Sequence, residues 1–76
     1  MKTADKEKLA KEFGIFIREA REKRGLYQHE VADQLGVARS YYTHIENGIR
    51  DIYFSLAVDI CNILELDLNE FMKRLK

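Results

Sequence analysis

The sequence predicts an all-α fold in which five short helices form a single domain spanning residues 1–76. Apolar residues recur at intervals of three and four along most of the chain, which is the spacing of one helix face. Glycines follow three of these runs, as they commonly do at helix ends. No segment carries the pattern of a strand, and no proline, repeat or linker divides the chain.

The first predicted helix begins at Leu9, because residues 1–8 alternate charges without apolar anchors and are expected to fray. Gly14 interrupts this helix and costs about 1 kcal/mol relative to alanine. Basic residues at its end suit the helix dipole, and Gly25 stops it. Its apolar face consists of Leu9, Phe13, Phe16, Ile17 and Ala20.

Residues 28–48, QHEVADQLGVARSYYTHIENG, contain two further short amphipathic helices joined by a tight turn. Gly36 ends the first helix, and Asn47-Gly48 ends the second. Ala32 is small enough for the two helices to cross closely. A small residue, a glycine four residues later and spaced apolar residues beyond it form the helix-turn-helix pattern. The apolar positions are Val31, Ala32, Leu35, Tyr42 and Ile45.

Two more helices complete the predicted domain. A connecting loop, IRDIYF, leads to a fourth helix over residues 55–64, with Ser55 as its cap. Asp67 caps the last helix, whose apolar residues are Leu68, Phe71, Met72 and Leu75.

The motif resembles the Cro/repressor-type (XRE-like) family of helix-turn-helix DNA-binding domains, which contains the lambdoid phage repressors. The resemblance runs from Phe13 to Phe71 and implies a five-helix, lambda-repressor-like DNA-binding domain. Tyr27 and Ala38 depart from it, since they replace the usual capping residues at the starts of the two motif helices. We expect each to cost about 1 kcal/mol, with Glu30 compensating the first through the helix dipole.

The resemblance also implies that the second motif helix enters the major groove of DNA and presents its first residues to the bases. We predict base contacts by Arg39, Ser40, Thr43 and His44. A guanidinium can hold O6 and N7 of guanine together, which discriminates by about 1–3 kcal/mol. For Arg39 the alternative is a phosphate contact or a solvated side chain, and for His44 it is no contact at all.

Four residues are predicted to touch the DNA backbone: Gln28, Tyr41, Asn47 and Arg50. The resemblance implies that Gln28 holds a phosphate and braces the recognition helix; a solvated glutamine is the alternative. Asn47 matches a phosphate-contacting position but also suits a helix C-cap. The neighbouring Asp51 opposes a role for Arg50.

A structural ion pair is implied between Arg21 and Glu46, whose matching positions in the family tie the first helix to the end of the recognition helix. Two independent surface charges are the alternative.

The last two helices carry more apolar residues than a domain of this size needs for its core. We therefore predict a homodimer, with an interface drawn from Ile60, Ile63, Leu64, Leu66, Leu68 and Phe71. Paired recognition helices about 34–36 Å apart would match successive major grooves. The loop residues Ile49, Ile52, Tyr53 and Phe54 are also more apolar than the family pattern.

The 13 basic and 13 acidic residues cancel, whereas a DNA-binding domain usually carries a basic surface. Residues 1–24 hold eight basic and five acidic residues, and residues 51–76 hold three and five, so the folded domain can still present one positive face.

No catalytic motif, metal-ligand spacing or cofactor signature is present, so we expect neither an enzyme nor a cofactor nor a small-molecule ligand. His29, His44 and Cys61 lack the spacing of a metal site, and Cys61 is expected to be a buried, inert thiol. Without an apolar run of membrane-spanning length or a signal peptide, a cytoplasmic protein that does not contact membranes is expected.

The sequence thus predicts a transcriptional regulator that binds a palindromic operator in double-stranded DNA as a homodimer. The alternative keeps the fold but makes it a protein-interaction module, an antitoxin or an adaptor, whose C-terminal helices bind another protein.

Overall fold

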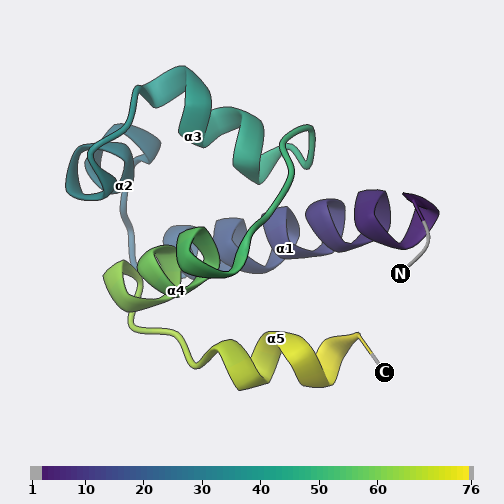
Figure 1. Cartoon of the computed structure of the whole chain (residues 1–76). Helices are drawn as coiled ribbons and strands as arrows, with labels where there is room; N and C mark the ends of the chain where they lie inside the picture. The colour runs from purple at the N-terminus through teal and green to yellow at the C-terminus, as the bar shows by residue number, and fades with distance from the viewer. Residues whose placement is uncertain (1–2, 76) are drawn as a thin grey trace.

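Five α-helices form the described part of the computed structural model, which covers the backbone of residues 3–75 and the side chains of residues 6–75. They are α1 (Thr3–Lys23), α2 (Gln28–Leu35), α3 (Arg39–Glu46), α4 (Phe54–Ile63) and α5 (Leu68–Arg74). These residues include no β-strand, which confirms the all-α prediction. Figure 1 shows α1 crossing the middle of the molecule, with α3 on one side of it and α5 on the other. None of the five helices has the length and apolar character needed to span a membrane.

Helix α1 begins earlier than the apolar pattern predicts. It starts at Thr3 and not at the predicted Leu9. The fraying of residues 1–8 stays a prediction, and residues 1–2 lie outside the described part. The early turns are rich in lysine, glutamate and alanine, which favour a helix without burying an apolar face. Lys6 Nζ also lies 3.4 Å from Asp51 Oδ2, which links the start of α1 to the loop after α3.

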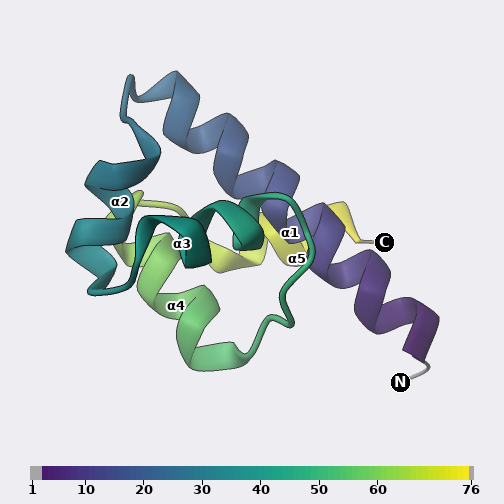
Figure 2. The same cartoon turned by 90° about the horizontal axis from the view of Figure 1, so that it is seen from above.

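The helix-turn-helix motif has the predicted boundaries. Gly36 has φ +78°, and its N–H and that of Val37 donate to the last carbonyl oxygens of α2. This left-handed backbone lets α3 leave at an angle to α2, which Figure 2 shows from above. At the start of α2, Glu30 Oε1 accepts from the Tyr27 N–H at 2.7 Å. A hydrogen bond therefore replaces part of the cap that tyrosine cannot supply.

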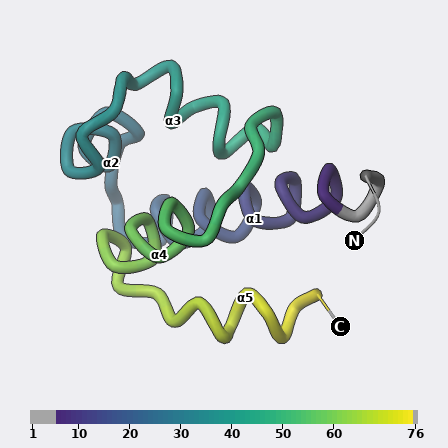
Figure 3. The backbone as a smooth tube through the Cα atoms, in the orientation of Figure 1, coloured from purple at the N-terminus to yellow at the C-terminus, as the bar shows by residue number. Residues whose placement is uncertain are grey.

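The loop between α3 and α4 passes the N-terminal half of α1, as the backbone tube in Figure 3 shows. Helix α4 then begins at Phe54 with Tyr53 before it, so the prediction of Ser55 as its cap is wrong. Asp67 does cap α5, since its side chain accepts from the Asn69 N–H at 2.9 Å.

The core joins all five helices. At its centre, the rings of Phe13 and Phe71 meet edge to face with centroids 5.2 Å apart, and Phe16 lies beside Phe71 at 5.4 Å. The buried apolar side chains around them include Ile17, Val31, Ala32, Tyr42, Ile45, Leu56, Ala57, Ile60, Cys61 and Leu64.

Half of the predicted dimer interface belongs to this core. Ile60, Leu64 and Phe71 are at most 4% exposed, so they present no surface to a second copy, and that prediction is wrong for these three. They lie inside because they belong to the buried cluster that also contains Phe13 and Phe16 of α1, whose rings pack against Phe71. The other three, Ile63, Leu66 and Leu68, are only partly buried against the core.

Helices α1 and α3 approach each other closely at Gly14, which is buried. A Cβ atom there would lie 2.8 Å from the Ile45 carbonyl oxygen and would collide with that of Glu46. The glycine that weakens α1 as an isolated helix is therefore what lets α3 pack on it.

Candidate nucleic-acid interface

The first turn of α3 projects from the domain on the side away from α5 (Figure 1). Arg39 and Ser40 are exposed, and Thr43 and His44 are half-buried along the same helix. Tyr42 and Ile45, by contrast, are fully buried and anchor the opposite face. The four predicted base-reading residues therefore share an accessible surface, and none of them is turned into the core.

Gln28 connects the two motif helices. Its Nε2 donates to Glu46 Oε1 at 3.0 Å, and its Oε1 accepts from the Thr43 hydroxyl at 3.0 Å. Gln28 therefore braces α3, as the resemblance implied, while its phosphate contact stays a prediction. Because the Thr43 hydroxyl donates its hydrogen to Gln28 Oε1, Thr43 can contact a base only through its oxygen lone pairs and its methyl group.

The predicted ion pair between Arg21 and Glu46 is present and buried. Arg21 Nε donates to Glu46 Oε2 at 2.6 Å and Nη2 to Oε1 at 3.1 Å, while Nη1 donates to the Leu26 carbonyl oxygen at 2.8 Å. The Glu46 residue is 1% exposed. Two independent surface charges are therefore excluded for this pair.

Burial and hydrogen bonding compete at Glu46. Burial alone would raise the pKa of its carboxyl group, but hydrogen bonds from Arg21 and Gln28 outweigh it, and the pKa is lowered. The Tyr42 hydroxyl is buried beside this carboxylate without a well-aligned partner among the described residues, and burial raises the pKa of Tyr42 far above its ordinary value. The carboxylate thus stays ionised beneath α3 and fixes the end of that helix to α1.

Arg18 is a contributor that sequence reasoning missed. Its Nη2 donates to the Glu46 carbonyl oxygen at 3.3 Å and to Asn47 Oδ1 at 3.4 Å. A cation is thereby held at the C-terminal end of α3, where it offsets the helix dipole. The sequence did contain one signal for this role: Arg18 precedes Arg21 by three residues, which places both arginines on the same face of α1. Asn47 occupies the C-cap position of α3 with an exposed side chain, as one of its two predicted roles requires.

Tyr41 and Arg50 come together although a loop separates them in sequence. The guanidinium carbon of Arg50 lies 4.8 Å from the Tyr41 ring centroid, in cation–π geometry. Asp51, which was expected to oppose Arg50, instead pairs with Lys6 on α1.

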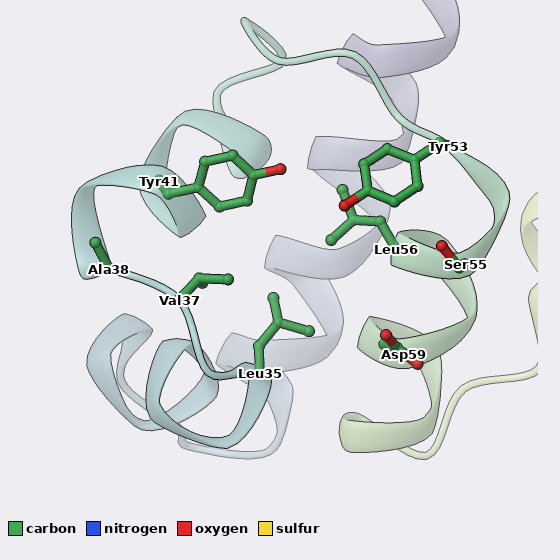
Figure 4. Close-up of a pocket in the computed structure, with 8 residues that line it drawn as sticks. All are labelled: Leu35, Val37, Ala38, Tyr41, Tyr53, Ser55, Leu56 and Asp59. Atoms are coloured by element: carbon green, nitrogen blue, oxygen red, sulfur yellow. The ribbon is translucent and has the colours of Figure 1, made fainter.

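An open cleft of about 270 Å³ lies beside the first turn of α3. Figure 4 shows Tyr41 and Tyr53 directed toward each other across its mouth, above an apolar floor that includes Val37 and Leu56. Partial burial and the neighbouring Tyr53 raise the pKa of Tyr41, while Arg50 acts in the opposite direction. Within residues 6–75, no three histidine, cysteine or carboxylate side chains cluster closely enough to hold a metal ion.

A recognition helix that is exposed at its start and locked to the core at its end defines a helix-turn-helix domain of the XRE type. The chain belongs to this family: the family described as "Helix-turn-helix domain" matches residues 14–74. The family and the fold are those of DNA-binding regulators.

Proteins that resemble the chain include a bacterial regulator and a solved structure. An uncharacterized HTH-type transcriptional regulator, YqaE, of Bacillus subtilis (strain 168) is 33% identical over 61 residues, which cover 80% of this chain and 53% of that protein. The chain thus spans about half the length of this curated relative. The crystal structure of the clp gene regulator ClgR from Corynebacterium glutamicum superposes with a TM-score of 0.80 at 22% identity, covering 84% of this chain and 68% of that one. That likeness shows the fold.

Proposed function

We propose that this protein is a sequence-specific transcriptional regulator that inserts α3 into the major groove of double-stranded DNA. The observation that carries the proposal is the state of α3: its polar first turn is exposed while Gln28, Arg21 and Arg18 fix its second half. Such pre-organisation suits a surface that must match base edges, because little is left to order on binding. The similar protein YqaE of Bacillus subtilis, whose name describes it as an HTH-type transcriptional regulator, supports this function.

The proposed contacts divide into two kinds. Arg39 and Ser40 read bases first, because they are exposed at the start of α3; Thr43 and His44 follow one turn later. Gln28 and Asn47 lie at the start of α2 and the end of α3 and hold phosphates on either side, since phosphate contacts fix the position of a protein on the duplex.

Removal of the Arg39 guanidinium tests base reading. Selection from a random DNA pool first yields a duplex that the wild-type protein prefers. Arg39→Ala should then weaken binding to that duplex by about 5- to 150-fold, the loss of one bidentate base contact. Fluorescence anisotropy on the selected duplex and on a random duplex measures both affinities, and thermal unfolding should be nearly unchanged because Arg39 is exposed.

The random duplex supplies the comparison. If Arg39 contacts a base, its removal lowers the affinity for the selected duplex much more than the affinity for the random duplex. An equal loss on both would make Arg39 a phosphate ligand, and no loss would remove it from the interface.

We also propose a homodimer, with its interface at an apolar patch formed by the exposed Tyr53, Phe54 and Met72 and the half-buried Ile52. Phe54 is 77% exposed, and the patch surrounds a shallow apolar cleft of about 140 Å³ between α1, α4 and α5. A two-fold pairing there would cover large apolar side chains that one chain leaves in water. Two copies would bind a palindromic operator.

Phe54→Glu should raise the dimer dissociation constant by at least about 100-fold, because each chain would bring an unpaired charge into the interface. Sedimentation equilibrium measures it. Ile15→Glu is the matched control, since Ile15 is an exposed apolar residue on α1 outside the patch. A monomeric wild type, or a Phe54→Glu dimer as tight as the control, would contradict this interface.

The same patch favours a second candidate function, in which the domain binds another protein rather than DNA. The absence of net charge agrees with it. A salt titration separates the two: a DNA-binding protein loses affinity for a random duplex steeply with salt, whereas an interaction module gives a slope near zero.

A further inference from the structure

The arginines of the chain fall into two groups. Arg18, Arg21, Arg24 and Arg74 each pair with a carboxylate. Arg39 and Arg50 have no carboxylate within 4.0 Å among the described side chains, and both are exposed. They are also the two basic residues within residues 25–50, the segment that contains the motif. The arginines that remain available to an anion therefore belong to the recognition helix and the loop after it.

Arg50 is held in place without being neutralised. Its guanidinium lies over the Tyr41 ring at 4.8 Å from the centroid, and an aromatic face attracts a cation without removing its charge. The adjacent carboxylate of Asp51 lies 3.4 Å from Lys6 Nζ, so its charge is paired elsewhere. A loop arginine is thus kept beside α3 with its full charge.

Tyr41 is a rigid support for this arrangement. It projects from α3 and packs against the edge of the core, and its hydroxyl end faces Tyr53 across the cleft in Figure 4. A half-buried ring with two χ angles has little freedom to move, so the guanidinium on its face occupies a defined position.

We propose that Tyr41 positions Arg50 for contact with a DNA phosphate flanking the major groove that α3 enters. This inference rests on the proposed DNA-binding function and deepens it: Arg50 is the ligand of the phosphate, and Tyr41 is the positioning residue. Arg50 donates no side-chain hydrogen bond among the described residues, and a cation–π contact uses none of its N–H groups, so the contact with Tyr41 and phosphate binding are compatible.

The salt dependence of binding to a random duplex tests the proposal, since each phosphate contact contributes about 0.9 to the slope of log affinity against log salt. Arg50→Gln should lower the magnitude of the slope by about 0.9. Tyr41→Leu should lower it partly, and Tyr41→Phe, which keeps the ring, should restore the wild-type slope. In the Arg50→Gln background, Tyr41→Leu should cause no further change, because the two residues act on one contact.

Arg74→Gln is the matched control. Arg74 also lies over an aromatic ring, with its guanidinium carbon 5.3 Å from the Phe16 centroid, but it pairs with Glu19 and sits on α5, away from α3. Its removal deletes the same charge and should leave the slope unchanged. Thermal unfolding verifies that each variant is folded.

The outcomes are distinguishable. An unchanged slope for Arg50→Gln in a protein that binds DNA overturns the phosphate contact alone. An unchanged slope for Tyr41→Leu overturns the positioning role, and an equal loss for Arg74→Gln overturns the specific phosphate contact of Arg50. If the wild-type protein binds no duplex at low salt, the proposed function itself fails and the inference fails with it.

Discussion

Replacing Arg21 with methionine is expected to lower the free energy of unfolding by about 3–5 kcal/mol, because the carboxylate of Glu46 is left buried without its partner. Arg21 supplies two of the hydrogen bonds to this carboxylate, at 2.6 and 3.1 Å. Gln28 would remain as a neutral donor, and Arg18 Nε would remain 3.8 Å from Glu46 Oε1, but Arg18 is partly exposed and donates no hydrogen bond to the carboxylate oxygens. Urea denaturation followed by circular dichroism measures the loss.

Arg24→Met is the matched control, since Arg24 pairs with Glu65 on the surface, where the two side chains are 41% and 72% exposed. An exposed pair contributes about 0–1 kcal/mol, so this variant should remain close to wild type. Arg21→Met combined with Glu46→Leu should recover part of the lost stability, because the buried charge is then absent. If Arg21→Met cost no more than Arg24→Met, the burial of this ion pair would be contradicted.

This ion pair also has a functional consequence. Glu46 is the last residue of α3, and its carboxylate binds Arg21 of α1 and Gln28 of α2. The orientation of α3 thus depends on Arg21, Gln28 and Glu46, none of which is among the residues proposed to read bases. Variants of Arg21 should for this reason weaken DNA binding even at temperatures where they remain folded.

The sequence was most informative where one residue determines the local backbone. Gly25, Gly36 and Gly48 all adopt positive φ, and each follows a helix that ends where the pattern predicts. Asp67 caps α5 for a similarly local reason. The ion pair between Arg21 and Glu46, in contrast, is separated by 25 residues and was anticipated only through the family resemblance.

The errors concern what lies opposite a residue in space. Helical spacing places Ile60 and Leu64 on one face, but it does not reveal whether α1 or a second chain covers that face. Arg50 lies over the Tyr41 ring and Asp51 pairs with Lys6, and neither contact follows from a periodic pattern. The start of α1 was missed because a helix without an apolar face gives no periodic signal.

Gly14 shows how a local preference and a tertiary contact can have opposite signs. In an isolated helix, Gly14→Ala would stabilise α1 by about 1 kcal/mol. In this fold the new methyl group would meet backbone atoms of Ile45 and Glu46, which cannot move aside as a flexible side chain can. Overpacking of this kind costs about 1–3 kcal/mol in well-packed cores, and α1 and α3 would have to separate.

We therefore expect Gly14→Ala to destabilise the protein by about 1–3 kcal/mol, measured by urea denaturation, and to weaken binding to the selected duplex because α3 is displaced. Glu22, which is exposed on the same helix, provides the reference. There, the alanine variant should be more stable than the glycine variant by about 1 kcal/mol. A stabilised Gly14→Ala protein, with the same sign as at position 22, would mean that α1 and α3 are farther apart than a glycine contact requires.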